Sequence, residues 1–263
     1  MPALGMGTYL LKNEACISAV EAAIRVGYRH IDTAQVYGNE SAVGTAIKKS
    51  ALPRGELFLT TKVWTDSFHE CDLEKSVDDS LLKLKTNYVD LLLLHWPNPK
   101  VPLAETLKSL NEVLKSGKTK AIGLSNFTVA LMNQAMALSE APISVNQVEY
   151  HVLLSQKAVL ACAKKNHMAI TAYSPLAQGR VRDQAILSEV GAKYGKSASQ
   201  VALRWLVQQD EVGAIPKASS ETNLRMNFEI FDFTLSEDDL LKINALQGNT
   251  RVNSFDFSPV WDK

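Results

Sequence analysis

The sequence predicts a (β/α)8 barrel of the TIM type. Short apolar runs rich in β-formers alternate with longer segments in which apolar residues recur at intervals of three and four. Most of the short runs are too apolar for a sheet with one face in water, so they indicate buried parallel strands. The chain has 263 residues without a Pro/Gly/Ser-rich linker, and a barrel of eight βα units needs about 250. We therefore expect one barrel domain over residues 1–263.

Eight runs are the candidate strands of this barrel. In chain order they are ALGMG (3–7), YRHID (28–32), LFLTTKV (57–63), YVDLLLLH (88–95), KAIGLS (120–125), ISVNQVE (143–149), MAITAYS (168–174) and VGAIP (212–216). A doubly wound sheet is the competing fold. Its dinucleotide fingerprint is missing, because Gly5-Met6-Gly7 is followed by Leu10 where the third glycine should stand.

The segments between the strands have helical periodicity. After the first strand, Asn13 is a candidate N-cap, Ile17, Val20 and Ile24 form one apolar stripe, and Gly27 is a left-handed C-terminal stop. The same spacing recurs at Leu73, Val77, Leu81 and Leu84, and at Leu103, Leu107, Leu110 and Leu114 with Gly117 behind them.

Composition narrows the class of partner. With 28 basic and 28 acidic residues the formal net charge is zero, which argues against nucleic acid or an anionic membrane as partner and favours a small molecule. No signal-type or membrane-spanning segment is visible, and Cys16, Cys71 and Cys162 lack the spacing of a disulfide framework or a zinc site. We expect a soluble, cytoplasmic, monomeric protein that needs no metal.

Polar residues interrupt the apolar runs where three consecutive strands end. Asp32, Lys62 and His95 are separated by 30 and 33 residues, which is one βα unit per step. Since the C-terminal ends of barrel strands face one mouth, these side chains should converge there. Tyr37 should join them from the loop after the second strand.

These four groups suit protonation of an oxyanion. A phenol has a pKa near 10, so it needs a nearby cation such as Lys62 to stabilise its anion. Asp32 would hold the lysine, and His95 could hydrogen-bond a substrate oxygen. Each residue also has an ordinary structural interpretation, and an Asp–Lys pair can be a simple ion pair. Types and spacing alone leave both interpretations open.

The sequence resembles the aldo-keto reductase family over essentially its whole length. The shared motifs are LGMGT (4–8), HIDTAQVYGNE (30–40), TTKVW (60–64), LLLLHWP (91–97), IGLSNF (122–127), NQVEYH (146–151), AYSPLAQG (172–179) and AIPKASSETNLRMN (214–227). Within the family it is most similar to the short bacterial reductases of 2,5-diketo-D-gluconate and methylglyoxal. The resemblance implies that Tyr37 is the general acid, that Lys62 and Asp32 lower its pKa, and that His95 positions the carbonyl.

The resemblance also implies a nicotinamide cofactor lying extended across the barrel mouth. The matching positions are Ser125, Asn126 and Gln147 at the carboxamide, Tyr173 under the nicotinamide ring, Gly7 and Thr8 near ribose and nicotinamide, Ser174 and Leu176 along the pyrophosphate, and Lys217, Ser219 and Asn227 at the adenosine end. An ammonium such as that of Lys217 suits a phosphate.

The adenosine end departs from longer family members. Ala218 and Asn223 stand where those members commonly have serine and arginine, and Met226 replaces a glutamate. Ser219, Ser220 or Arg225 could compensate. We therefore predict NADPH over NADH by a modest margin, with NADH also usable.

The substrate pocket is expected to be aromatic. Tyr9, Trp64 and Trp96 fall at family pocket positions, and the tail SFDFSPVWDK (254–263) corresponds to a loop that can border the site. The loop WPNPKVPL (96–103) is short, which suggests an open mouth that accepts small aldehydes, dicarbonyls or keto sugars.

Two other functions remain as alternatives. Lys62 could act as a Schiff-base nucleophile, although a paired carboxylate favours the charged amine over the nucleophilic one. The chain could also bind a cofactor without turnover, because a fold does not fix a function.

Overall fold

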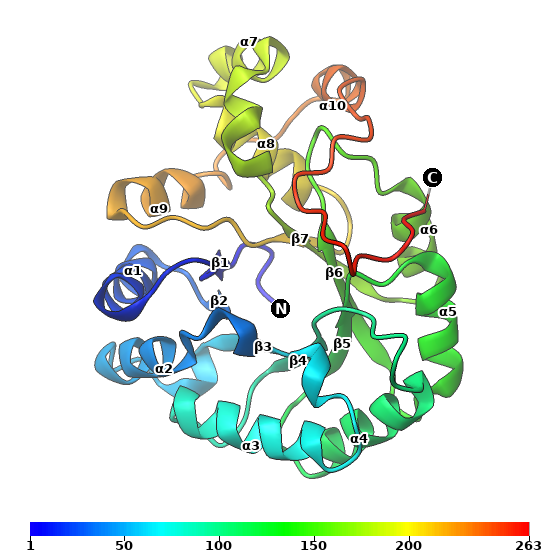
Figure 1. Cartoon of the computed structure of the whole chain (residues 1–263). Helices are drawn as coiled ribbons and strands as arrows, with labels where there is room; N and C mark the ends of the chain where they lie inside the picture. The colour runs from blue at the N-terminus through cyan, green and yellow to red at the C-terminus, as the bar shows by residue number, and fades with distance from the viewer. Residues whose placement is uncertain (263) are drawn as a thin grey trace.

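The computed structural model describes residues 1–262, so Lys263 at the end of the predicted tail lies outside the described residues. Its centre is one sheet of eight parallel strands in the order of the chain (Figure 1). The strands are β1 (Met6–Gly7), β2 (His30–Asp32), β3 (Phe58–Val63), β4 (Leu91–Leu94), β5 (Ile122–Ser125), β6 (Ile143–Glu149), β7 (Ala169–Tyr173) and β8 (Val212–Ala214). All eight coincide with predicted runs, and the barrel prediction is confirmed.

The first and last strands meet to close the barrel. Leu4 forms an isolated parallel bridge with Ala214, and the amides of Gly5 and Gly7 donate to the carbonyls of Ala214 (2.9 Å) and Pro216 (3.1 Å). A Cβ on Gly7 would lie 2.8 Å from the carbonyl oxygen of Ile215. This close backbone approach requires a glycine at the seam between β1 and β8.

Helices surround the strands as a ring (Figure 1). They are α1 (Asn13–Val26), α2 (Glu40–Lys49), α3 (Asp72–Leu84), α4 (Leu103–Lys115), α5 (Val129–Leu138), α6 (Lys157–Lys165), α7 (Ala185–Tyr194), α8 (Ala198–Val207), α9 (Glu221–Phe228) and α10 (Glu237–Asn244). Short 3-10 segments are η1 (Gln35–Tyr37), η2 (Arg54–Glu56), η3 (Thr65–Ser67) and η4 (Ala177–Asp183). No helix within residues 1–262 is long and apolar enough to cross a membrane.

The ends of α1 show one confirmed and one wrong prediction. Gly27 adopts φ 122° and its amide donates to the carbonyls of Ala23 (3.1 Å) and Ile24 (3.2 Å), as expected of a C-terminal stop. Asn13 is not the N-cap. It is the first helical residue, with φ 46°, and Lys12 in extended conformation precedes it without a side-chain cap.

Strand side chains alternate between two cores, as the two-residue repeat of a strand requires. In β4 all four leucines are buried. Leu92 and Leu94 belong to the large cluster between the strands and the helices, whereas Leu91 and Leu93 pack with Val145 of β6 in a separate small cluster. This filled interior leaves the functional groups at the carboxyl ends of the strands.

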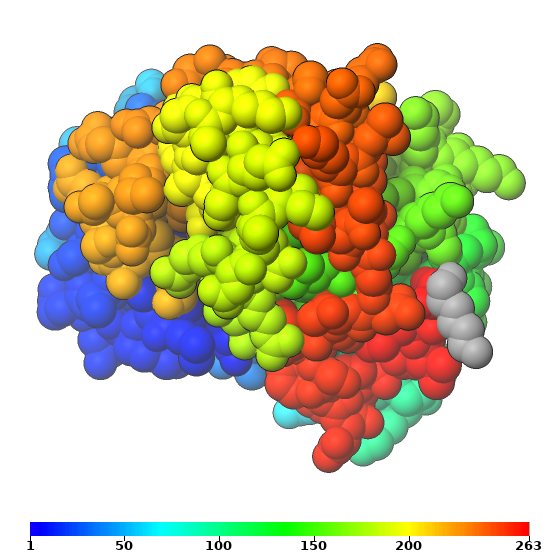
Figure 2. Space-filling view, turned by 90° about the horizontal axis from the view of Figure 1, so that it is seen from above, coloured from blue at the N-terminus to red at the C-terminus, as the bar shows by residue number. Residues whose placement is uncertain are grey.

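The C-terminal tail, residues 250–262, lies across this end of the barrel. Figure 2 shows it, in red, running beside the yellow-green segment that contains η4. Gln178 of η4 donates to the carbonyl of Val252 at 3.3 Å, which joins the two segments.

Candidate active site

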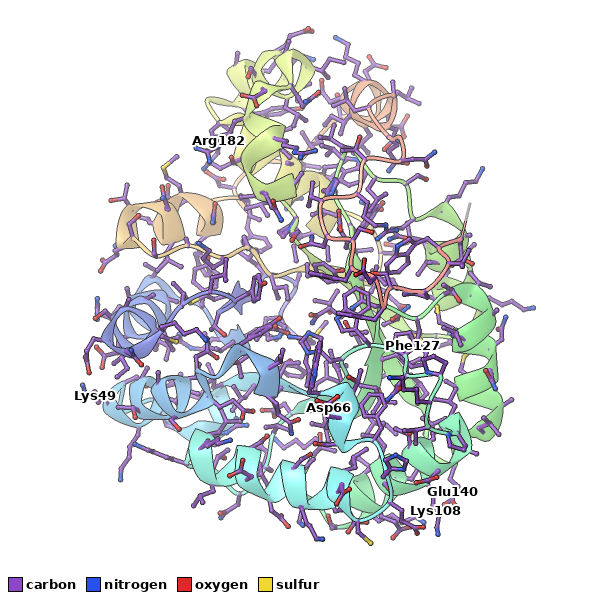
Figure 3. All side chains as sticks on the ribbon, viewed as in Figure 1. Lys49, Asp66, Lys108, Phe127, Glu140 and Arg182 are labelled. Atoms are coloured by element: carbon purple, nitrogen blue, oxygen red, sulfur yellow. The ribbon has the colours of Figure 1, made fainter. Side chains whose placement is uncertain are left out.

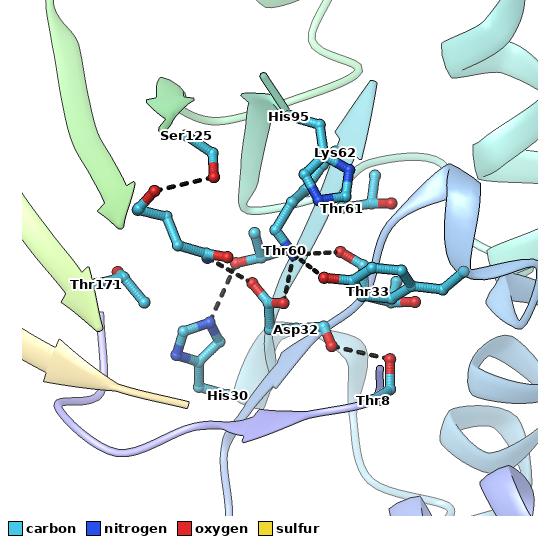
Figure 4. A network of polar contacts seen from close by, with 12 residues as sticks. Thr8, His30, Asp32, Thr33, Thr60, Thr61, Lys62, His95, Ser125 and Thr171 are labelled. Atoms are coloured by element: carbon cyan, nitrogen blue, oxygen red, sulfur yellow. Dashed lines mark hydrogen bonds and ion pairs between the residues drawn. The ribbon is translucent and has the colours of Figure 1, made fainter. Parts of the chain in front are cut away.

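Four predicted residues converge at the barrel mouth. Asp32 ends β2, Lys62 lies near the end of β3, His95 follows β4, and Tyr37 ends η1 (Figure 4 shows the polar network around Asp32 and Lys62). The Lys62 Nζ lies 2.5 Å from Asp32 Oδ1 and 3.5 Å from the Tyr37 hydroxyl. The rings of Tyr37 and His95 meet edge to face with centroids 5.6 Å apart. The three residues predicted from strand-end spacing therefore lie together, and Tyr37 joins them from η1 after β2.

Lys62 is fully buried and has its N–H groups directed at acceptors. Besides Asp32 and the Tyr37 hydroxyl, its Nζ donates to the carbonyl of Thr33 at 2.8 Å. Burial lowers the pKa of Lys62, while the charge and hydrogen bond of Asp32 oppose that shift. An ammonium with three acceptors has no free lone pair, so this arrangement disfavours the Schiff-base role.

The predicted direction of the Tyr37 pKa is wrong. Burial, and then the negative charge of Asp32, hold the pKa of Tyr37 well above its usual value, and the distant Lys62 contact does not reverse this. The reason is that burial disfavours the charged phenolate, and the negative charge of Asp32 adds to that effect. Tyr37 is therefore a neutral phenol at ordinary pH, which is the form that can donate a proton.

His95 is a neutral, almost buried imidazole. Burial, and then the charge of Lys62, hold its pKa well below its usual value. Its Nδ1 has no hydrogen-bond partner among the described residues, and an orphaned buried nitrogen is costly. Trp64 lies edge to face against the ring at 5.3 Å. His95 can thus offer a hydrogen bond to a ligand without carrying charge.

A cleft of about 1460 Å³ opens over these groups. Its lining includes nearly all of the predicted cofactor and substrate positions, namely Gly7, Thr8, Tyr9, Trp64, Trp96, Ser125, Asn126, Gln147, Tyr173, Ser174, Leu176, Lys217 and Asn227. Ser219 is exposed and is not part of the lining, so the structure does not bring it to the site. Within residues 1–262 no group of three or more His, Cys, Asp or Glu side chains is arranged to hold a metal ion.

Gln147 has a role that sequence reasoning missed. Its Nε2 donates to Asp32 Oδ2 at 2.8 Å, so half of this buried amide is satisfied inside the protein rather than by a ligand. Asp32 is thereby held by Lys62 on one oxygen and by Gln147 on the other. Pairing across 115 residues of chain leaves no signal in local sequence.

The hydroxyl groups of Ser125 and Tyr173, which also line the cleft, are fixed by hydrogen bonds. Ser125 Oγ donates to the Gln147 carbonyl at 2.9 Å, and Tyr173 donates to Asn126 Oδ1 at 2.8 Å, which sets the orientation of the aromatic ring. Asn126 has φ 65° and is not a helix cap, because Thr128 caps α5. The side-chain Nδ2 of Asn126 also donates to the His95 carbonyl at 3.0 Å.

The far end of the cleft is basic. Lys217 follows β8 and is exposed beside Asn223, Met226 and Asn227. Arg182 of η4 and Lys196 also line the cleft, and neither was predicted. Figure 3 shows Arg182 on the side of α8 and α9, across the mouth from Asp66 of η3.

The near end of the cleft has aromatic walls. Tyr9 lies 5.1 Å from Tyr37, and Phe257 of the tail packs edge to face on Trp96 at 5.3 Å and on Trp64 at 6.0 Å. Phe255 stacks on Phe257 at 5.2 Å. Of the predicted tail, Ser254, Phe255 and Phe257 line the cleft.

Comparison with known proteins agrees with this geometry. A model of the Aldo/keto reductase family matches residues 3–247. The methylglyoxal reductase DkgB of Escherichia coli O157:H7 is 40% identical, over 100% of this chain and 99% of its own length. A crystal structure of a protein provisionally described as 2,5-diketo-D-gluconic acid reductase B has a TM-score of 0.98 at 46% identity, and covers 100% of this chain and 94% of that one.

A second solved structure contains a cofactor. The aldo-keto reductase AKR2E5 complexed with NADPH is 33% identical with a TM-score of 0.92. The match covers 97% of this chain and 86% of that one. Both the fold and the family resemblance are thereby supported independently of the four clustered residues.

Proposed function

Because this chain belongs to the aldo/keto reductase family and is an oxidoreductase, we propose that it reduces small aldehydes, dicarbonyls or keto sugars with NADPH, using Tyr37 as general acid. The observation that carries the proposal is the neutral phenol of Tyr37 beside a neutral imidazole and a buried ammonium. A carbonyl that accepts hydride becomes an alkoxide, and this cluster can offer that oxygen a proton from Tyr37 and a hydrogen bond from His95.

The protein groups have separate tasks in this proposal. His95, held neutral, donates a hydrogen bond that orients the substrate carbonyl toward the Tyr37 hydroxyl. Tyr37 transfers its proton to the developing alkoxide oxygen. The resulting tyrosinate is stabilised by the Lys62 ammonium, whose Nζ lies 3.5 Å from the hydroxyl. Asp32 keeps Lys62 charged and fixed in position.

The residues of the cleft fit a nicotinamide cofactor, which when bound supplies the hydride. Gln147 Oε1 has no donor among the described residues, although its Nε2 is bound to Asp32. That free acceptor would meet a carboxamide N–H, with Ser125 and Asn126 beside it. The oriented face of Tyr173 would support the ring. Lys217 would hold the phosphate at the adenosine end.

The first test measures NADPH oxidation with methylglyoxal and with 2,5-diketo-D-gluconate, for the native protein and for Tyr37→Phe. Both proteins should have the same circular dichroism spectrum and melting temperature. We expect turnover by the native protein and a loss of about 10²-fold or more in the variant, since one positioned acid typically contributes that much. Cofactor binding without turnover by the native protein would instead indicate a binding protein.

Cofactor preference is a separate proposal. Lys217 supports NADPH, whereas Ala218 and Asn223 offer less to a phosphate than serine and arginine would. We expect kcat/KM with NADPH to exceed that with NADH by about tenfold, the value of one exposed charge-assisted contact. Lys217→Met should remove that margin, and equal use of both cofactors by the native protein would contradict it.

A further inference from the structure

A buried carboxylate at the end of β6 lies outside the four clustered residues. Glu149 is 0% exposed, and so is His151 two residues later. A buried carboxylate is costly unless its oxygens are fully hydrogen-bonded. The partners of Glu149 are therefore informative about its purpose.

Both oxygens of Glu149 are bound, mainly by the C-terminal tail. Oε1 accepts from His151 Nε2 at 3.0 Å and from the amide of Val252 at 2.6 Å. Oε2 accepts from the amide of Asn253 at 2.9 Å and from Asn253 Nδ2 at 3.1 Å. Three of these four donors belong to two consecutive tail residues, so one carboxylate fixes the backbone of the tail.

The assignment of these donors is consistent with a charged Glu149. The amide of Leu153 donates to His151 Nδ1 at 3.3 Å, so His151 is a neutral imidazole with its proton on Nε2. Burial raises the pKa of Glu149, but the hydrogen bonds from His151, Val252 and Asn253 outweigh this and leave the pKa below its usual value. Charge-assisted hydrogen bonds are stronger than neutral ones.

The same tail builds the substrate side of the cleft. Beyond Asn253, Phe255 and Phe257 are about half exposed, at 45% and 51%, yet both pack edge to face on Trp96, at 5.7 and 5.3 Å. Edge-to-face aromatic pairs are weak contacts and do not hold a half-exposed segment of chain alone. Gln178 also bonds the Val252 carbonyl and the Val129 amide bonds Asp262, but the buried anchor of the tail is the carboxylate of Glu149.

Asn253 also reaches the cofactor side. Its Nδ2 donates to Ser174 Oγ at 3.0 Å, and Ser174 lines the cleft with φ 47°. Glu149 itself pairs in register with Tyr173, the strand neighbour that lines the nicotinamide position. Glu149, through Asn253, therefore connects the tail to the strand ends that form the floor of the site.

We propose that Glu149 is a positioning residue that sets substrate selectivity, because its carboxylate clamps Val252 and Asn253 and so places the Phe255–Phe257 wall over the catalytic groups. The selectivity part of this inference rests on the proposed reductase function. Bulky aromatic carbonyl substrates, which reach the wall, depend on the clamp. Methylglyoxal, which is too small to need the wall, does not.

The test compares Glu149→Gln, Phe257→Ala and the double variant with the native protein. Glutamine keeps the size but replaces an acceptor oxygen by a donor, so at least one tail donor faces another donor. Asp239→Asn is the matched control, because Asp239 is a buried carboxylate of α10, 1% exposed, that bonds Lys193, Tyr194 and Ser236 and not the tail. Melting temperatures are recorded for all variants.

The kinetic readout is KM for 4-nitrobenzaldehyde against methylglyoxal. We expect KM for the aromatic aldehyde to rise about tenfold in Glu149→Gln and in Phe257→Ala, with no further rise in the double variant. KM for methylglyoxal should rise much less than KM for the aromatic aldehyde, so the ratio of the two KM values reports the state of the wall. Additive effects in the double variant, or equal losses for both substrates, would overturn the proposal.

A second readout needs no activity. Trypsin cleavage after Arg251, followed by mass spectrometry of the released tail, reports whether the clamp is closed. We expect Glu149→Gln to accelerate this cleavage about tenfold or more and Asp239→Asn to leave it unchanged. Unchanged cleavage in Glu149→Gln would overturn the clamp. If the native protein reduces neither aldehyde, the reductase proposal fails while this measurement still decides the role of Glu149.

Discussion

Replacement of Lys62 by methionine tests the central electrostatic reasoning. The substitution keeps the length of the side chain but removes the ammonium. In the native protein Asp32 is 1% exposed and its two oxygens accept from Lys62 at 2.5 Å and from Gln147 at 2.8 Å. The variant leaves a buried carboxylate with one neutral hydrogen bond.

The expected loss of stability is large. Removing one partner of a buried ion pair costs about 3–5 kcal/mol, because the remaining charge stays desolvated. For a chain of this size each kcal/mol lowers Tm by about 2–4 °C, so Lys62→Met should melt roughly 6–20 °C lower than the native protein. Carbonyl reduction should also fall by about 10²–10⁴-fold, since the tyrosinate loses its cation.

Thermal and guanidinium unfolding of the native protein, the single variants and the double variant test this ion-pair account. Asp32→Asn/Lys62→Met removes both charges, so it should recover most of the lost stability and remain within about 1–2 kcal/mol of the native protein. It should stay as inactive as Lys62→Met. A single variant that melts like the native protein, or a double variant less stable than the single one, would refute the account of a buried ion pair.

Three further predictions follow from burial and close packing. Burial lowers the pKa of the His30 side chain to about 4, although the charge of Asp32 opposes this shift. In the unfolded chain a histidine has a pKa of about 6.5, so below that pH the unfolded state binds more protons than the folded state. The free energy of unfolding should therefore fall by up to about 1.4 kcal/mol per pH unit between about pH 6.5 and about pH 4. His30→Gln should flatten that slope in denaturant titrations at several pH values, and an unaltered slope would contradict it. Gly44→Ala places a Cβ 2.6 Å from the backbone of Leu84, so it should lower the free energy of unfolding by about 1–3 kcal/mol. Gly55→Ala is the control, because nothing lies within 4 Å of its added Cβ, and it should change that free energy by less than about 0.5 kcal/mol. Since the pKa of Tyr37 is held well above its usual value, the kcat/KM for reduction should stay level from about pH 6 to 9, and a basic-limb loss near pH 8 would contradict that assignment.

The convergence of Asp32, Lys62 and His95 was predictable because strand-end spacing depends only on the length of a βα unit. Periodicity likewise predicted a helix over the stripe from Leu103 to Leu114, which lies within α4. The N-terminus of α1 was not predictable from cap preference. Lys12 precedes the helix without a side-chain cap, and its own side chain donates to the distant carbonyl of Tyr37.

Other features depend on distances that no local pattern contains. The sign of the Tyr37 pKa shift required the relative weight of burial, Asp32 and Lys62. The bond from Gln147 to Asp32 spans 115 residues, and the bonds from Glu149 to the tail span 103 and 104. Arg182 follows a recognised motif, but its place in the cleft depends on the path of η4.

The seam between β1 and β8 has a consequence for how the barrel fluctuates. β1 has two residues and β8 has three, and the seam itself rests on an isolated bridge and a few amide bonds. Gly7 and Lys217, which flank this seam, both line the cleft. Any ligand that spans the cleft from end to end would therefore bridge the junction of the first and last strands. Amide hydrogen exchange at Gly5 and Gly7 should then slow when the cleft is occupied, because a bound ligand adds contacts on both sides of the seam.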